Sequence, residues 1–154
     1  MELRRVVITG IGAITPIGNT APEYWDNLCK GVSGAGKITR FDSTKLKTHI
    51  ACEIKGYDSE AYFDRKESRK LDLYAQYAIV AADEAIKDSR IDKGNTDFDE
   101  VGVVFASGIG GISSLYYDMM DSDWNGEALR LSPFTIPRLL PDLASGHISI
   151  KHGF

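Results

Sequence analysis

The chain has 154 residues, about the length of one average domain. Its 18 lysines and arginines are outnumbered by 22 aspartates and glutamates, which gives a net charge of −4 and argues against a general nucleic-acid binder or an electrostatic membrane binder. Apolar residues at 43% and charged residues at 26% exclude disorder as the main state.

No stretch of about 18 apolar residues is present, and the apolar run near the N-terminus is too short for a signal peptide. The two cysteines form no Cys-x-x-Cys pair, so neither a disulfide framework nor a zinc site is indicated. These features predict a cytoplasmic protein.

The first third of the chain predicts two strands and a helix. Residues 3–9 are rich in β-branched side chains and end at glycine, which is typical of a buried strand. A helix is expected over residues 21–30, with a proline near its start and Gly31 after its end. Residues 31–37 read as a loop, and a short strand is expected over residues 50–54.

The next elements carry the strongest periodicity. Apolar residues recur at intervals of three and four over residues 66–89, which predicts one long helix. A second buried strand is expected over residues 101–106, followed by a glycine-rich turn and a helix from about residue 112. Strand, helix and strand in this order suggest a parallel βαβ unit. Three prolines interrupt the otherwise helical end of the chain.

Two glycine motifs resemble nucleotide-binding loops but lack required residues. Residues 31–38 read GVSGAGKI, and Ile38 stands where a P-loop needs a hydroxyl for Mg²⁺. The GIG of residues 10–12 follows a predicted strand, yet Thr15 replaces the third glycine of a dinucleotide fingerprint and Pro16 follows instead of a helix. ATP and NAD binding are therefore not expected.

The histidines and cysteines do not form a reactive cluster. On a helix, His147 and His152 would point about 140° apart, so they would not bind a metal together. His49 stands apart from them, beside a predicted strand. Cys29 and Cys52 occupy positions where a small buried side chain is usual, and neither lies at a predicted helix N-terminus, where a nucleophilic cysteine is favoured.

A basic cluster, RKESRK, occupies residues 65–70 of this acidic chain. Lys66, Arg69 and Lys70 would share one face of a helix by their spacing. Cations at a helix start oppose the helix dipole, so the cluster is unfavourable there. It fits either a solvated helix face with neighbouring carboxylates or a docking patch for an acidic partner.

Seven segments of the chain match the motifs of one known protein family. They are VVITGIGAITPIG (6–18), GVSGAG (31–36), FD (41–42), RKESRK (65–70), GIGG (108–111), SPF (132–134) and ASGHIS (144–149). Together these segments resemble the β-ketoacyl-ACP synthases of type II fatty-acid synthesis, and most closely the β-ketoacyl-ACP synthase II group. The resemblance implies an α/β fold, the thiolase-like layered α/β/α/β/α arrangement of which this chain is roughly the N-terminal half, and a homodimer.

The same resemblance implies where the catalytic groups lie. The family's nucleophilic cysteine follows the segment that matches residues 146–154, so residues 1–154 would be an incomplete N-terminal β-ketoacyl synthase domain. No catalytic residue is then expected in this chain, which alone would be inactive. His147 and His152 match non-catalytic positions, and neither a cofactor nor a metal is implied.

The resemblance assigns roles to five residues. Lys66, Arg69 and Lys70 match the patch that docks acyl carrier protein, Ile109 matches the residue that gates the acyl pocket, and Phe134 matches a residue lining the partner subunit's pocket. Pro141 departs from the family, whose matching segment is helical, and is therefore expected to kink that helix. The implied function is decarboxylative Claisen condensation of acyl-ACP with malonyl-ACP in fatty-acid elongation. A non-catalytic carrier-binding fragment and a subunit like the chain-length factors are the alternatives.

Overall fold

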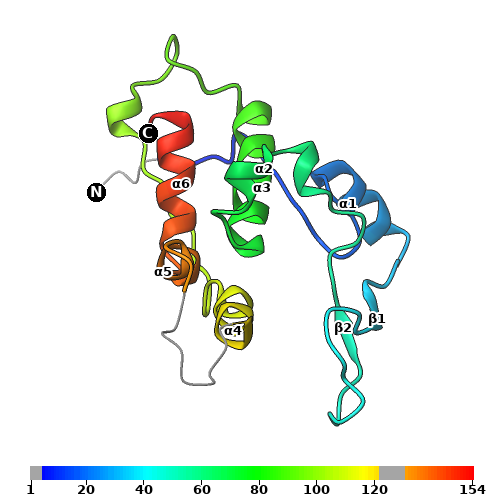
Figure 1. The fold of residues 1–154 in the computed structure, drawn as a ribbon. Helices are drawn as coiled ribbons and strands as arrows, with labels where there is room; N and C mark the ends of the chain where they lie inside the picture. The colour runs from blue at the N-terminus through cyan, green and yellow to red at the C-terminus, as the bar shows by residue number, and fades with distance from the viewer. Residues whose placement is uncertain (1–4, 122–130) are drawn as a thin grey trace. The chain divides into compact units, whose positions relative to one another are not determined.

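A computed structural model describes residues 5–121 and 131–154 of the chain (Figure 1). The chain divides into two compact units. Within the described residues, none of the helices combines the length and the apolar character that crossing a membrane requires. Unit 1 comprises Met1–Tyr57 and Val80–Ile91, and unit 2 comprises Asp58–Ile79 and Asp92–Phe154.

Helix α1 (Ala21–Cys29) of unit 1 begins and ends at local signals. The Thr20 hydroxyl accepts a hydrogen bond from the Glu23 N–H at 3.3 Å, which caps the helix N-terminus. Gly31 follows the C-terminus with a φ of +69°, a left-handed conformation that glycine adopts without strain. The helix expected over residues 21–30 is therefore confirmed to within one residue.

Residues 10–13 lie directly against helix α3 (Leu73–Ser89) within unit 1. A Cβ atom at Gly12 would lie 1.9 Å from the Ala81 carbonyl oxygen, so only glycine permits this approach. The Ala13 N–H donates to the Glu84 carboxylate at 2.9 Å. The glycines of this segment thus serve helix packing in the structure.

Two short strands pair in unit 1, β1 (Ala35–Lys37) and β2 (Ile50–Cys52). Figure 1 shows the two strands beside each other. They are antiparallel, and Gly36 stands opposite Ala51. The strand expected at residues 50–54 is confirmed, whereas β1 falls where a loop was expected. The segment Ala-Gly-Lys has weak strand propensity, so its extended form depends on pairing with β2.

The two longer predicted strands are absent from the described residues. Residues 5–9 and 101–106 belong to no strand, and Val6, Ile8 and Val104 are 90%, 83% and 98% exposed. The predicted parallel βαβ unit is therefore wrong for this structure, whose described strands pair antiparallel. The side chains of both segments suit a buried strand, but a strand also needs a neighbour that supplies backbone hydrogen bonds, and the described residues provide none.

The single helix expected over residues 66–89 is two helices in the structure. Helix α2 (Arg65–Ser68) ends one turn after it begins, and α3 starts at Leu73. The Asp72 carboxylate accepts from the Tyr74 N–H at 3.0 Å, so it caps a new helix start. The buried Gln76 side chain donates to the Ser68 carbonyl at 3.1 Å, which satisfies a group that the break leaves without a helical partner.

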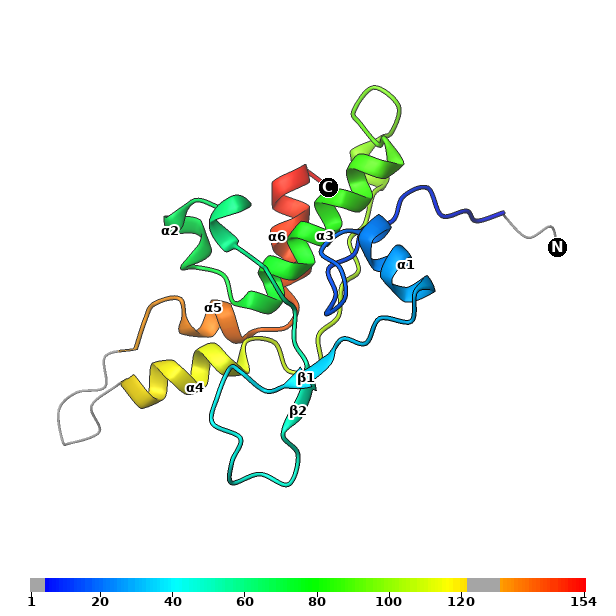
Figure 2. The same cartoon turned by 90° about the vertical axis from the view of Figure 1, so that its right-hand side faces the viewer.

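Among its described residues, the C-terminal part of unit 2 contains three helices, α4 (Ile112–Asp121), α5 (Thr135–Leu139) and α6 (Leu143–His152). Figure 2 shows α4 and α5 side by side, in agreement with their close contacts. The helix expected from residue 112 is confirmed. The expected polar segment at residues 121–131 lies largely outside the described residues.

Pro141 separates α5 from α6 instead of kinking one helix. Leu140 has a ψ of 123°, the extended conformation that the residue before proline prefers. The expected kink is therefore wrong: the helix ends at Leu139 and a new one begins at Leu143.

The apolar core of unit 2 combines α3 and α6 side chains with residues of the connecting segments. Two short 3₁₀ turns, η1 (Ser59–Ala61) and η2 (Phe98–Glu100), lie in these segments. The buried apolar residues of unit 2 are Phe63, Leu71, Ala75, Ala78, Ile79, Ala144 and Ile148.

Tyr74 links the start of α3 to the α5–α6 connection, because its hydroxyl donates to the Leu140 carbonyl oxygen. Burial raises the pKa of Tyr74 above its ordinary value, and the carboxylates of Asp72 and Asp142 raise it further. The stabilisation from neutral Tyr74 is thus fully present below its unfolded pKa of about 10 and is lost as the pH rises through the folded pKa.

We expect Tyr74→Phe in the full gene product to remove part of the alkaline loss of stability. Urea unfolding between pH 8 and 12 measures this, with Tyr116→Phe, an exposed tyrosine of α4, as the control. An alkaline profile that is identical in Tyr74→Phe and in the unmodified protein would contradict the assignment.

Candidate functional site

The basic cluster of residues 65–70 starts at a capped helix turn. The Asp64 carboxylate accepts from the Lys66 N–H at 2.7 Å and from the Glu67 N–H at 2.8 Å. This anionic cap offsets the unfavourable position of cations near a helix start. The Asp64 cap therefore compensates for the cost that the sequence predicts.

Lys66, Arg69 and Lys70 are all exposed. Because α2 ends at Ser68, Arg69 and Lys70 lie beyond the helix, so the expected single helical face is wrong. Within residues 5–121 and 131–154, none of the three is in an ion pair with a carboxylate. Their charges therefore remain available to an anionic partner.

Lys70 reaches from this cluster to Phe134, which precedes α5. The Lys70 Nζ atom lies 5.8 Å from the centre of the Phe134 ring, within the range of a cation–π contact. The structure thus brings together a residue predicted for docking and a residue predicted for the acyl pocket. The Phe134 side chain remains partly exposed, at 37%.

Ile109 lies in the glycine turn before α4 and is 62% exposed. The Gly110 N–H donates to the Ser107 hydroxyl at 3.0 Å, and Gly110 has a φ of +75°. The Gly111 N–H then donates to the Leu139 carbonyl at 3.2 Å. The turn therefore packs on the last residue of α5, whereas Phe134 is the N-cap of the same helix.

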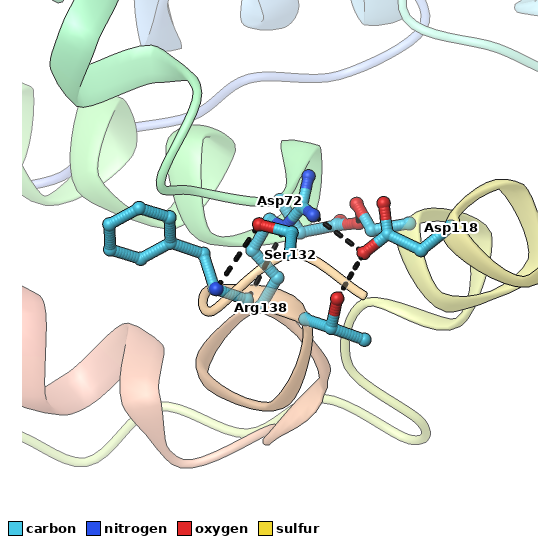
Figure 3. A network of polar contacts seen from close by, with 7 residues as sticks. Asp72, Asp118, Ser132 and Arg138 are labelled. Carbon is cyan, nitrogen blue, oxygen red and sulfur yellow. Dashed lines mark hydrogen bonds and ion pairs between the residues drawn. The ribbon is translucent and has the colours of Figure 1, made fainter. Parts of the chain in front are cut away.

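A polar network joins α5 to α4 (Figure 3). The Arg138 guanidinium lies 2.6 Å from the Asp118 carboxylate, and the Thr135 hydroxyl donates to the same carboxylate oxygen. On the α3 side of α4, the Ser114 hydroxyl donates to Asp72 at 2.5 Å.

This network is not predicted from the sequence. Asp118 and Arg138 are 20 residues apart, and no helical spacing connects them. The pairing depends on how α4 and α5 pack, so periodicity and spacing rules could not have found it.

The cysteines do not occupy the buried positions expected of them. Cys29 and Cys52 are both exposed free thiols. Cys29 is the last residue of α1, whereas a nucleophilic cysteine is favoured at a helix N-terminus. Cys52 lies in β2, away from any helix start.

The histidines have separate surroundings. The His49 ring shares a hydrogen bond with the Ser43 carbonyl at 2.9 Å, and the His152 ring stacks on Phe154. His147 is half-buried on α6. In the part of the chain that the structure describes, no group of three or more histidine, cysteine, aspartate or glutamate residues could hold a metal ion.

A cavity of about 670 Å³ in unit 1 is bounded partly by Ile11, by Trp25 of α1, and by Glu84 and Asp88 of α3. None of the predicted site residues lines it. Both carboxylates already accept backbone hydrogen bonds, Glu84 from Ala13 and Asp88 from Ile11. Their positions are thus explained by the packing of residues 10–13 on α3.

Residues 3–154 match the family model described as the N-terminal domain of β-ketoacyl synthase. The chain is 44% identical over 153 residues to 3-oxoacyl-[acyl-carrier-protein] synthase 2 of Staphylococcus aureus strain N315, which covers 97% of this chain and 36% of the relative. It is 39% identical to the protein of the same name from Synechocystis, with 99% of this chain and 36% of the relative covered. The chain thus spans about a third of the length of these relatives.

Solved ketosynthase structures share its fold. The ishigamide ketosynthase/chain length factor matches with a TM-score of 0.77 and 27% identity, covering 96% of this chain and 36% of that one. A β-ketoacyl synthase from Burkholderia phymatum matches with a TM-score of 0.73 and 22% identity, with the same coverage. The α/β fold class of these ketosynthases, with its thiolase-type architecture, is therefore confirmed for this chain.

Proposed function

This chain belongs to the β-ketoacyl synthase family, whose N-terminal domain it matches, and we propose that it provides the carrier-docking surface and part of the acyl pocket of a 3-oxoacyl-ACP synthase. The observation that carries the proposal is the contact between Lys70 and Phe134. An unpaired cation that attracts an acidic carrier lies directly beside an exposed aromatic ring that suits an alkyl chain.

In the proposed reaction, an acyl group passes from the thiol of its carrier to a cysteine thiolate, which forms a new thioester and releases the carrier thiol. Malonyl-ACP then loses CO₂, and the resulting carbanion attacks the enzyme-bound thioester. A carbon–carbon bond forms and the cysteine leaves as thiolate. The product is a 3-oxoacyl-ACP longer by two carbons.

In the proposed reaction, the residues of this chain bind the carrier and the acyl chain before any bond forms or breaks. Lys66, Arg69 and Lys70 attract the acidic carrier and orient it. Ile109, exposed on the glycine turn, gates the acyl pocket, and Phe134 lines that pocket across a dimer interface. Cys29 and Cys52 take no part, because neither lies at a helix N-terminus that would favour a thiolate.

We also propose that the gene product is a cytoplasmic homodimer. Exposed apolar side chains gather on and next to α5, where Phe134, Ile136 and Leu140 are 37%, 58% and 41% exposed. Apolar surface of this kind is typical of an interface between subunits. The two free thiols are compatible with a reducing compartment.

The alternative function is that of a non-catalytic subunit like the chain-length factors. One observation favours it, because one of the similar solved structures is a ketosynthase/chain length factor. Such a subunit would share the fold and the docking surface but would not condense. A carrier-binding protein without activity would behave in the same way in a condensation assay.

A condensation assay separates these functions. The full gene product is incubated with acyl-ACP and malonyl-ACP, and mass spectrometry measures the 3-oxoacyl-ACP formed. The proposal predicts product, and Phe134→Ala is expected to lower kcat/KM for a 16-carbon acyl-ACP by about tenfold through lost apolar contact. Carrier binding without product would favour the non-catalytic alternatives.

A further inference from the structure

The ion pair of Asp118 in α4 with Arg138 in α5 has no part in the proposed function described so far. We propose that Asp118 and Arg138 are positioning residues that hold Phe134 in place and thereby set the range of acyl lengths accepted. This inference rests on the proposed function, in which Phe134 lines the acyl pocket.

The pair is shielded from solvent. The Arg138 and Asp118 side chains are only 16% and 18% exposed, and the distance between Nη2 and Oδ2 is 2.6 Å. Thr135, which is 1% exposed, donates its hydroxyl to the same oxygen. Charge-assisted hydrogen bonds in such surroundings are stronger and more directional than exposed surface pairs.

The network acts on the backbone of Phe134. Thr135 follows Phe134 directly, and the Arg138 N–H donates to the Phe134 carbonyl at 2.8 Å. The Arg138 Nε–H also lies 3.4 Å from this carbonyl, while the Phe134 N–H donates to the Ser132 hydroxyl at 3.2 Å (Figure 3). The backbone of Phe134 is thus held on both sides, while its ring remains partly exposed.

Helix α5 depends on these contacts for its position. It has five residues and no side-chain cap at its N-terminus, and a helix this short is not stable by itself. Its C-terminal end rests on the glycine turn through the Gly111 bond to Leu139. Its N-terminal end, which carries Phe134, is held by Thr135 and Arg138 through Asp118.

A displaced pocket wall affects long substrates most. A long acyl chain gains more from apolar contacts along the pocket than a short one, because each buried methylene adds to binding. Misplacement by about 1 Å is enough to lower a rate markedly. Loss of the ion pair should therefore reduce turnover of long chains more than turnover of short ones.

The test measures chain-length preference in the full gene product. The quantity is the ratio of kcat/KM for 16-carbon acyl-ACP to that for 8-carbon acyl-ACP. We expect Asp118→Ala and Arg138→Ala each to lower this ratio by about tenfold, and the double variant to lower it no further, because both remove the same interaction. Arg138→Lys, which keeps the charge, should retain most of the preference.

Ser114→Ala is the matched control. It removes a hydrogen bond of α4 that goes to Asp72 rather than to α5, so it should leave the ratio unchanged. The unfolding midpoint of every variant is measured in parallel. This separates a general loss of stability from an altered preference.

Phe134→Ala distinguishes the two ways in which the inference can fail. If Phe134→Ala changes the ratio while Asp118→Ala and Arg138→Ala lower only the unfolding midpoint, the pair is purely structural and the inference is wrong, although the proposed pocket stands. If Phe134→Ala leaves the ratio unchanged, Phe134 does not line the acyl pocket, and both the proposed pocket and the inference are wrong.

Discussion

Reversing the charges of Lys66, Arg69 and Lys70 to glutamate in the full gene product is expected to raise the Kd for an acidic acyl carrier protein by about 100-fold at low salt. All three side chains are exposed and are unpaired with any carboxylate of the described residues. Reversal replaces three attractions by three repulsions. Because salt screens charges over about 10 Å at 0.1 M, the salt dependence of binding should also flatten or invert.

The control for this prediction reverses three exposed lysines outside the cluster. Lys30, Lys45 and Lys47 belong to unit 1 and lie outside residues 65–70. Because each carries one positive charge, reversing them changes the net charge by the same amount as reversing the cluster. Affinity is measured by calorimetry at several salt concentrations. If both triple variants weaken binding equally, net charge governs the interaction and the cluster is only a solvated surface.

Replacing Gly110 by alanine is expected to lower the free energy of unfolding by about 3 kcal/mol. The new Cβ would lie 2.1 Å from the Leu139 carbonyl oxygen, which is backbone and cannot move aside freely. The φ of +75° adds strain for any residue other than glycine. The glycine turn would therefore separate from α5, and Ile109 would be displaced with it.

Gly108→Ala provides the matched control within the same turn. A Cβ at Gly108 meets no atom within 4 Å, so this variant should be within about 0.5 kcal/mol of the unmodified protein. Chemical denaturation of the full gene product measures both. Equal stability of the two alanine variants would show that the turn does not pack on α5 as the structure describes.

Elements with local signals could be predicted from the sequence. The start of α1 follows from Pro22 and its end from Gly31, because a proline in the first turn and a left-handed glycine act within a few residues. The apolar repeat likewise located α3. These elements depend little on the rest of the fold.

Elements that depend on distant partners were predicted less well. Residues 5–9 and 101–106 have the composition of strands, but composition does not supply a neighbouring strand. The break between α2 and α3 depends on Asp72 and on the Gln76 side chain, which the helical repeat does not reveal. In each case a long-range or side-chain hydrogen bond decides the backbone conformation.

In the candidate site, too, some features are predicted from the sequence and others depend on contacts between distant residues. The five predicted residues came from matching motifs, and the structure adds that Lys70 contacts Phe134 while Ile109 lies on the turn that meets the other end of α5. The contact between Asp118 and Arg138 could not be predicted, because it depends on the packing of two helices. The sequence thus indicated which residues to consider, and only the fold revealed how they are held.

Peptide mapping by mass spectrometry tests whether residues 1–154 receive and orient the substrate without forming the acyl intermediate. The full gene product is incubated with a labelled acyl-ACP and without malonyl-ACP, so that the acyl-enzyme accumulates. The account predicts a labelled cysteine thioester outside residues 1–154 and no label on Cys29 or Cys52. A stoichiometric acyl group on either of these two cysteines would contradict it.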